Sequence, residues 1–339
     1  MAANETSALR VVPFAPEHAQ LWDDFVWQSN NGTLFHTRAF LAYHPLERFH
    51  DDSLLFFKEG KLLAVLPAAI RAGNTDSPYN KQIKEGRGIL RSHPGASFGG
   101  FVTNSNLALR DAERLVTHFL AYCHERGYAG AEVTLPPQIY LARPSNYIDF
   151  IFYQHGFRYR KREVSSIVPL DLPVERVLEL FSPESRRAVR RAQKLGVQIG
   201  ESEDFPTFYE ILKKNLKLRH NVQPAHSLDE LLKLRQMFPE RIRLFAAHAE
   251  NEMIAGIVIF VCNRRIALAF YISHREAFQR YRGVNLLFYE VFRWCIAQGF
   301  RFLDFGIFTV NMQPNWGLGR FKESFGAQGI FRDTMLLEF

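Results

Sequence analysis

Cysteine is rare in this sequence. Among its 339 residues there are three, Cys123, Cys262 and Cys295, and no two of them have the CxxC spacing of metal or redox sites. So few thiols give no disulfide framework, which favours a reducing compartment. Cys123 and Cys295 also fall within apolar helical stripes, so we expect buried structural thiols.

Long apolar runs and a signal sequence are missing as well. The first ten residues are polar, unlike a secretory signal peptide. The longest apolar run, residues 253–262, is about half of the roughly 20 residues that a membrane-spanning helix needs. We therefore expect a cytoplasmic protein without a membrane span.

The sequence also lacks the common motifs for metals and nucleotide phosphates. Its 12 histidines include no HExxH pattern, and there is no P-loop, so we expect no metal cofactor. Charge is less decisive, because 42 Lys and Arg against 35 Asp and Glu give a net charge of only +7. Such an excess suits a polyanionic ligand such as a nucleotide, coenzyme A or RNA, and it is equally typical of a protein charged for solubility.

What the sequence does contain is one pattern that occurs twice. A chain of 339 residues exceeds the size at which one hydrophobic core usually stops growing, so two domains are expected. Residues 109–126 and 283–298 each read as an amphipathic helix that a glycine stops and a short strand follows. The two segments align without a gap at an offset of 172 residues.

Two further pairs of segments follow the same order. Strand patterns flank a short turn at Glu59-Gly60 and again at Glu250-Asn251. A weaker match relates residues 152–157 to residues 321–326. We therefore predict a duplicated α/β domain with a mixed sheet: a first domain over residues 1–172, in which residues 165–170 form the last strand, and a second over residues 173–339.

The order of these elements resembles the GNAT acetyltransferase fold, and two tandem copies resemble the Fem family of aminoacyltransferases and N-acyltransferases. The most specific likeness is Leu303-Asp304-Phe305-Gly306 followed by residues 319–327, GRFKESFGA, with the basic run of residues 185–194 as a second point. This resemblance implies two tandem GNAT-like domains. It further implies an N-acyltransferase that joins an activated acyl or aminoacyl group to an amine acceptor, with a role in cell-envelope biosynthesis.

Two residues of this C-terminal segment are candidates for catalysis. Lys322 lies on the apolar face that Leu318, Phe321 and Phe325 define, so it must reach the edge of that face or meet an anion. The resemblance implies the second, contact with an anionic substrate. Asp304 lies at a strand end, where a carboxylate can act as a general base or fill a structural role in the turn.

The donor site is expected at the start of the helix over residues 283–298. GNAT enzymes that use coenzyme A usually carry Arg/Gln-x-x-Gly-x-Gly/Ala there, and this chain has Arg280-Tyr281-Arg282-Gly283-Val284-Asn285. The predicted donor-binding residues are Arg280, Arg282, Gly283 and Asn285. Asn285 departs from the pattern, but residues 205–238 also lack the helical insertion of the tRNA-dependent enzymes. We therefore favour a thioester of coenzyme A over aminoacyl-tRNA as donor.

Acceptor binding is assigned more loosely. The glycine-rich stretch of residues 91–100 reads either as a loop lining the cleft between the domains or as a plain connection. The predicted acceptor-binding residues are Arg91, His93, Ser97 and Tyr271. The basic helix at residues 185–194 is either a solvated face or a surface for nucleotide or RNA phosphates.

A second class of function competes with catalysis. A transferase fold that has lost its activity would keep the domains and the basic cleft as a binding protein, since fold does not imply function. Asn285 in the donor pattern is the feature that keeps this alternative open.

Overall fold

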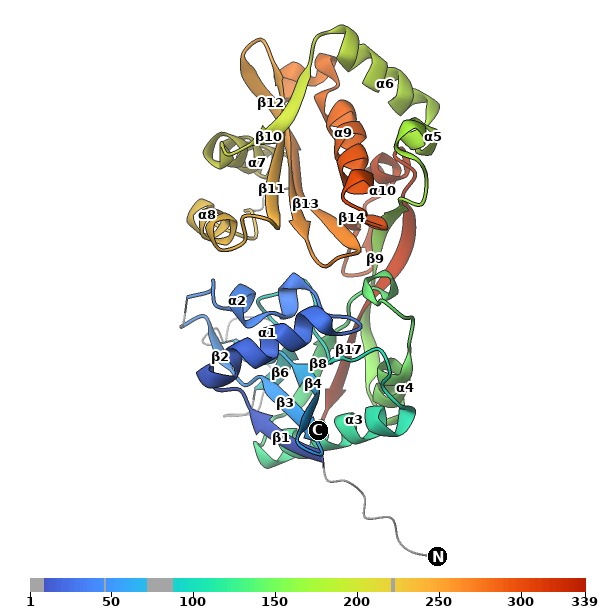
Figure 1. Ribbon diagram of the computed structural model, residues 1–339. Coiled ribbons are helices and arrows are strands. Elements are labelled where there is room, and N and C mark those ends of the chain that lie inside the picture. The colour runs from blue at the N-terminus through green and yellow to red at the C-terminus, as the bar shows by residue number, and fades with distance from the viewer. Residues whose placement is uncertain (1–8, 46, 72–87, 221–222) are drawn as a thin grey trace, which may run out of the picture. The chain divides into compact units, whose positions relative to one another are not determined.

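The computed structural model describes residues 9–45, 47–71, 88–220 and 223–339 (Figure 1). The polar composition of residues 73–88 predicts a surface loop, and residues 73–87 of this segment lie outside the described residues. The chain divides into two compact units: Met1–Arg162 with Arg332–Phe339, and Glu163–Phe331. None of the described helices is long and apolar enough to cross a membrane.

The second unit is a six-stranded sheet in the order β10-β11-β12-β13-β14-β9. Neighbouring strands are antiparallel except β13 and β14, which are parallel. The helices α7 and α8 lie against one face, and α9 covers the other (Figure 1). The strands are β9 (Arg158–Pro169), β10 (Gln198–Ser202), β11 (Ile242–Ala249), β12 (Glu252–Val261), β13 (Ile266–His274) and β14 (Phe302–Ile307), and the α-helices are α5 (Val177–Leu180), α6 (Pro183–Lys194), α7 (Phe205–His220), α8 (Leu228–Met237), α9 (Gly283–Ala297) and α10 (Trp316–Glu323).

The first unit repeats the central part of this plan. Its β6 and β8 are parallel neighbours joined through the long helix α3, as β13 and β14 are joined through α9. The strands are β1 (Leu9–Pro13), β2 (Phe49–Asp51), β3 (Leu54–Lys58), β4 (Lys61–Leu66), β5 (Ala69–Arg71), β6 (Ile89–Ser92), β7 (Val102–Thr103), β8 (Gly130–Thr134) and β17 (Gln328–Glu338), and the α-helices are α1 (Ala19–Gln28), α2 (Arg38–Leu41), α3 (Leu109–Glu125) and α4 (Tyr147–Gln154).

The matched hairpins have the same turn. Glu59 and Gly60 have φ angles of 52° and 75°, and Glu250 and Asn251 have φ angles of 52° and 63°. Two consecutive residues in the left-handed region make the tight two-residue connection whose twist suits antiparallel strands. The weaker match holds too, since α4 and α10 are each followed by a glycine with positive φ, Gly156 and Gly326. The mixed α/β architecture with a repeated plan is confirmed.

One strand lies in a different unit from the one predicted. Residues 165–169, expected to close the first domain, pair with β14 of the second unit, with Leu303 opposite Val168. Conversely β17 brings the C-terminus to β8 of the first unit, with Met335 opposite Val133. The strand pattern of β9 shows that it is extended but does not specify its neighbour, which depends on tertiary contacts. The boundary at residues 172/173 stays a prediction.

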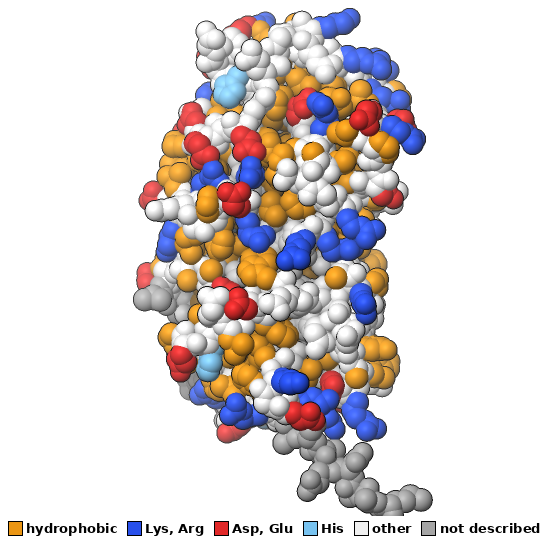
Figure 2. Space-filling view, viewed as in Figure 1, with side chains coloured by type: hydrophobic (Ala, Val, Ile, Leu, Met, Phe, Trp, Pro, Cys, Tyr) orange, Lys and Arg blue, Asp and Glu red, His pale blue; other side chains and the backbone are white. Residues whose placement is uncertain are grey.

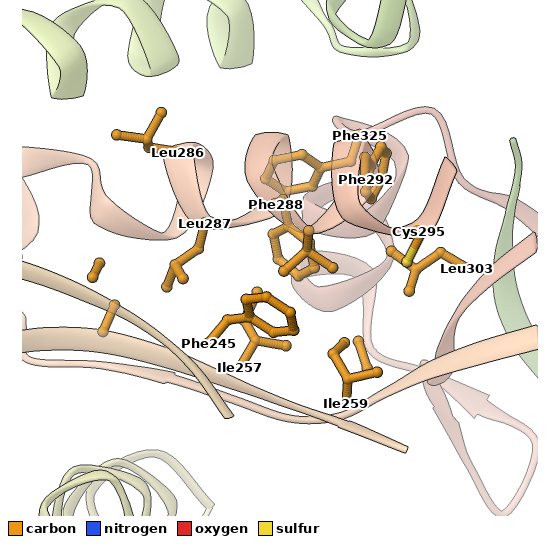
Figure 3. Close-up of a cluster of buried hydrophobic side chains, with 14 of the residues drawn as sticks. Phe245, Ile257, Ile259, Leu286, Leu287, Phe288, Phe292, Cys295, Leu303 and Phe325 are labelled. Atoms are coloured by element: carbon orange, nitrogen blue, oxygen red, sulfur yellow. The ribbon is translucent and has the colours of Figure 1, made fainter. Parts of the chain in front are cut away.

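The core of the second unit lies between α9 and the sheet (Figure 3). Phe288, Phe292 and Cys295 of α9 meet Ile257 of β12 and Phe325 beyond α10, and each is at most 1% exposed. The spacing of these helical residues at three and four positions is what places them on one face. Cys123 and Cys295 are buried as predicted, and burial raises the pKa of the Cys123 thiol to about 12, so it stays protonated and unreactive at neutral pH.

Acid should destabilise the first unit through His36. This side chain is 0% exposed, and burial lowers its pKa from 6.5 to about 4. Its ring accepts from the Thr33 amide and contacts the Gly99 carbonyl oxygen. Below pH 6.5 the His36 side chain binds a proton in the unfolded chain but not in the folded chain. The contribution of His36 to the free energy of unfolding is therefore fully present above about pH 6.5 and decreases between pH 6.5 and about 4. The loss is roughly 3 kcal/mol at most.

The measurement is urea unfolding at pH 7 and pH 5, followed by tryptophan fluorescence, since Trp22 donates to the His36 carbonyl. His36→Gln should reduce the dependence of the midpoint on pH without abolishing it, because His93 is also buried with a lowered pKa, whereas substitution of the exposed His50 by Gln should leave it as in the parent. An equal acid slope in the parent and the His36→Gln protein would show that other groups cause it.

Candidate functional site

A pocket of about 1000 Å³ opens at the N-terminal end of α9 in the second unit. Its walls come from α6, α7, the C-terminal half of β13, the segment leading into α9, and α10. The residues that carry the following argument are Ser185, Arg187, Arg191, Asn215, Ile272, Ser273, His274, Arg275, Arg282, Gly283, Asn285, Leu318 and Arg320.

The entry into α9 leaves backbone amides available to a ligand. Arg282 precedes the helix with a φ of 55°, in the left-handed region, so the chain turns sharply into Gly283. No side chain caps the first turn, and it contains no acidic residue. A Cβ on Gly283 would lie 3.0 Å from Ile254 Cδ1, so the glycine lets the helix start close to β12. Uncapped amides and the positive end of the helix dipole attract an anion.

Arginines surround this helix end. Arg187 and Arg191 come from α6, Arg282 from the turn and Arg320 from α10, and none of these four has an ion-pair partner among the described residues. Arg275 adds a fifth guanidinium, against the single carboxylate of Glu184 among the lining residues. Basic side chains also gather at the position of α6 in the space-filling view (Figure 2). The pocket therefore has the charge expected for a phosphate-bearing ligand.

The strands beside the pocket separate from each other. β13 and β14 pair only over three positions, from Ile266 opposite Phe302 to Leu268 opposite Asp304. The register of β12 and β13 then shifts, with Tyr271 opposite Val258 but Ala269 opposite Ile259, so Phe270 is an extra, bulged residue. Beyond this bulge the last three residues of β13 line the pocket, and their β14 side has no strand partner within the described residues.

Residues 183–323 match the family model of an acetyltransferase (GNAT) domain. All the pocket residues except Ser324 lie within this range. The pocket thus lies within the segment that matches the GNAT model, at the separated strands and helix start described above. No protein among the curated sequences matches the chain.

Solved structures show the same fold over nearly the whole chain. The crystal structure of FemX has a TM-score of 0.74 at 14% identity and covers 97% of each chain. A tandem GNAT protein from the clavulanic acid biosynthesis pathway has a TM-score of 0.57 at 12% identity and covers 98% of each chain. L-PGS from Bacillus licheniformis has a TM-score of 0.58 at 13% identity, over 95% of this chain and 91% of its own. These likenesses confirm the GNAT-like fold, tandem in one of the relatives.

Asp304 and Lys322, the predicted catalytic residues, meet at one backbone bend and do not line the pocket. Asp304 is 2% exposed, and its carboxylate accepts from the Gly306 amide and the Ser165 hydroxyl, both at 2.7 Å. Lys322 is also 2% exposed, and its ammonium donates to the carbonyls of Gly306 and Ile307 at 2.7 and 2.8 Å. Both charges therefore hold Gly306, which has a φ of 71° at the end of β14.

Three of the four predicted donor-binding residues line the pocket, and one does not. Arg282, Gly283 and Asn285 line the pocket, and the Asn285 amide nitrogen lies 3.4 Å from the Ser185 hydroxyl, to which it donates. Arg280 is not among the lining residues, because its guanidinium turns to Glu250 at 3.0 Å.

Tyr271, a predicted acceptor residue, is outside the pocket as well. It is 8% exposed, and its hydroxyl oxygen accepts from the His226 amide at 3.1 Å and lies 2.8 Å from His226 Nδ1. Burial raises the pKa of Tyr271. The sequence pattern of β13 predicts that successive side chains point to opposite faces of the sheet. It does not predict which face lines the pocket, and Tyr271 points to the face that contacts His226.

The other predicted acceptor residues lie in the first unit. Arg91 is paired with Glu132 at 3.1 Å, and His93 is 7% exposed with a pKa that burial lowers to about 3. The Gly95 amide donates to His93 Nδ1 at 3.0 Å. Ser97 stands in a Gly-x-Ser-x-Gly run, but β7 rather than a helix follows this loop, so the strand–turn–helix of a nucleophile elbow is lacking here.

The first unit differs at the helix start that corresponds to the pocket. The first turn of α3 contains Asp111, whose carboxylate pairs with Lys58 at 2.9 Å and Arg114 at 3.6 Å. A carboxylate from the protein itself therefore occupies the positive end of this helix, where α9 has none. The two corresponding helix starts therefore differ in charge, and an anion is favoured only at the start of α9.

Sequence reasoning missed Arg275 and Arg320 and left Arg187 and Arg191 undecided. The spacing of four puts Arg187 and Arg191 on one helix face, but Arg186 and Arg190 have the same spacing, so the sequence does not single out the pair that lines the pocket. Nothing in the sequence around Arg320 indicates that α10 meets the start of α9, because that contact is tertiary.

Proposed function

We propose that this chain is an N-acyltransferase that uses a thioester of coenzyme A, bound in the pocket of the second unit, to acylate an amine. The observation that carries the proposal is the uncapped start of α9 surrounded by arginines without ion-pair partners in the described structure. A volume of about 1000 Å³ is at the upper end of small-molecule pockets and suits an extended, phosphate-bearing donor.

The residues present divide the work of the reaction. Arg187, Arg191 and Arg282, with the amides at the start of α9, would hold the phosphates of the donor. The separation of β13 from β14 would admit the rest of the donor between the strands, and backbone amides of β13 beyond the bulge would polarise the thioester carbonyl. Asp304 and Lys322 would act as positioning residues, since they fix the bend of β14 at Gly306.

The transfer itself needs one neutral amine and one thioester held in line. The amine nitrogen attacks the thioester carbon, the carbon–nitrogen bond forms, and the carbon–sulfur bond breaks. The nitrogen loses one proton, and the leaving thiolate takes up one proton to become the thiol of coenzyme A. The products are an amide and free coenzyme A.

Two alternatives keep support from particular observations. An aminoacyl-tRNA donor is consistent with the Fem-like fold, but the described residues between 205 and 237 form only the two helices α7 and α8. A non-catalytic binding protein is consistent with Asn285, whose side chain stands in the pocket where the pattern has Gly or Ala. A role in cell-envelope biosynthesis is part of the proposal, on the likeness to FemX.

Calorimetric titration with coenzyme A tests the donor. We expect one molecule bound per chain, because of the two corresponding helices α3 and α9, α3 has Asp111 in its first turn and α9 has no acidic residue there. Acetyl-coenzyme A mixed with an amine should then release free thiol, which separates an enzyme from a binding protein. No binding of coenzyme A at millimolar concentration, together with tight binding of a charged tRNA, would reverse the choice of donor.

A further inference from the structure

An exposed segment beside the pocket contains no charged residue. Residues 305–319 include no Lys, Arg, Asp or Glu, in a chain in which 23% of residues are charged. Four large apolar side chains within nine residues of this segment are exposed, which is unlike the scattered single exposures of an ordinary surface. These four form what we call the apolar rim: Val310 at 67%, Met312 at 52%, Trp316 at 78% and Leu318 at 36% exposure.

The backbone beneath the apolar rim is firmly held. β15 (Thr309–Val310) and β16 (Gln313–Pro314) form a hairpin, and both residues of its turn, Asn311 and Met312, have positive φ. The Met312 amide donates to the buried Glu163 carboxylate at 3.3 Å. Asn315 then caps α10 by accepting from the Leu318 amide. The side chains of the rim are therefore presented on a fixed backbone.

The apolar rim is continuous with the pocket. Leu318 belongs to both, and Asn315, Gly317 and Arg320 of the same segment also line the pocket. A ligand in the pocket would contact Leu318, and Trp316, which does not line the pocket itself, lies between the lining residues Asn315 and Gly317. The segment offers such a ligand apolar surface and no charge.

Charge argues for the kind of ligand that uses this surface. Without bound donor phosphates, the five arginines that line the pocket repel a small amine in its cationic form, and the lining offers one carboxylate, Glu184, to attract it. Apolar surroundings and nearby cations both lower the pKa of an amine and favour the neutral, nucleophilic form. With one carboxylate in the lining, burial of apolar surface is the main attraction that the neighbouring segment can add, and the rim supplies it.

We infer that the apolar rim binds the apolar part of the acceptor, so that the acceptor is an amine attached to a hydrocarbon or aromatic group. The inference rests on the proposed function and specifies its acceptor class. Exposed aromatic and apolar side chains at the edge of a site bind a substrate through the area they bury, and burial of about 60 Å² changes affinity about tenfold.

The test measures binding of three amines by calorimetry, each in the presence and absence of coenzyme A: ethylamine, n-octylamine below its micelle concentration, and 2-phenylethylamine. At least one of the two apolar amines should bind about tenfold or more tightly than ethylamine. Preference for octylamine would indicate a hydrocarbon chain as the natural group, and preference for phenylethylamine an aromatic one. Equal affinities for all three would overturn the inference.

Variants connect the effect to the rim. Trp316→Ala should lower the affinity for the preferred apolar amine about tenfold and leave coenzyme A binding unchanged. Trp316→Phe should retain most of the affinity for that amine. Phe150→Ala is the matched control, since Phe150 is 50% exposed on α4 in the first unit. An unchanged preference in Trp316→Ala would contradict the inference. Failure of coenzyme A to bind the parent protein would instead count against the proposed donor, and the amine series would still decide on the rim.

Discussion

Lys322→Ala should lower the unfolding midpoint of the protein by about 6–12 °C, through a loss of about 3 kcal/mol in the second unit. The Lys322 ammonium is buried and donates to two carbonyls, so its removal leaves the Gly306 and Ile307 oxygens without this charged donor inside the protein. Removing one partner of a buried polar contact costs more than the contact contributes. Differential scanning calorimetry measures the change directly.

The matched control is Lys194→Ala, which removes an exposed lysine at the end of α6 and should leave the midpoint within about 1–2 °C. Unchanged thermal stability in Lys322→Ala together with a large loss of turnover would show that the ammonium contacts the substrate. If Lys322 is a positioning residue, the variant should lose thermal stability, and any loss of turnover should follow from displacement of β14.

The double substitution Arg187→Ala and Arg282→Ala should weaken coenzyme A binding by about two orders of magnitude. Each arginine lines the pocket without an ion-pair partner among the described residues, so each is available to a ligand phosphate. A hydrogen bond to a charged group contributes about 1.5–3 kcal/mol, and two of them account for such a loss. Calorimetric titration of the double variant gives the dissociation constant.

Arg280→Ala serves as the control for this pair. Arg280 belongs to the same sequence pattern as Arg282, but its guanidinium pairs with Glu250 at an exposed position outside the pocket. We expect less than a threefold change in affinity for the Arg280 variant. A larger loss of affinity in Arg280→Ala than in the double variant would show that the donor phosphates bind away from α6 and outside the pocket described above.

Much of the fold could be predicted because it depends on local patterns. The apolar stripe of α9 and the glycine after it indicated both the helix and its end, and the structure has that helix over Gly283–Ala297. The turns at Glu59-Gly60 and Glu250-Asn251 were visible because tight hairpins need residues that tolerate positive φ. Each of these signals lies within a few residues of the chain.

The candidate site was only partly predictable, because its residues come from separate elements. The pattern of residues 280–285 located the start of α9 but gave no means of separating Arg282, which lines the pocket, from Arg280, which does not. Tyr271 lies one register position beyond the bulge at Phe270, and such a bulge decides which way the following side chains point.

By itself, the sequence determined the repeated plan, the helix that begins at Gly283 and the place of Lys322 on an apolar helix face, since periodicity and turn chemistry act over short stretches of chain. Only the tertiary structure decided what Lys322 meets, because the Gly306 carbonyl lies 16 residues earlier in the chain. Tertiary structure also decided that α6, α9 and α10 bring their arginines around one pocket. Packing of apolar faces sets those positions, and the charged side chains that converge there leave no pattern in the sequence between them.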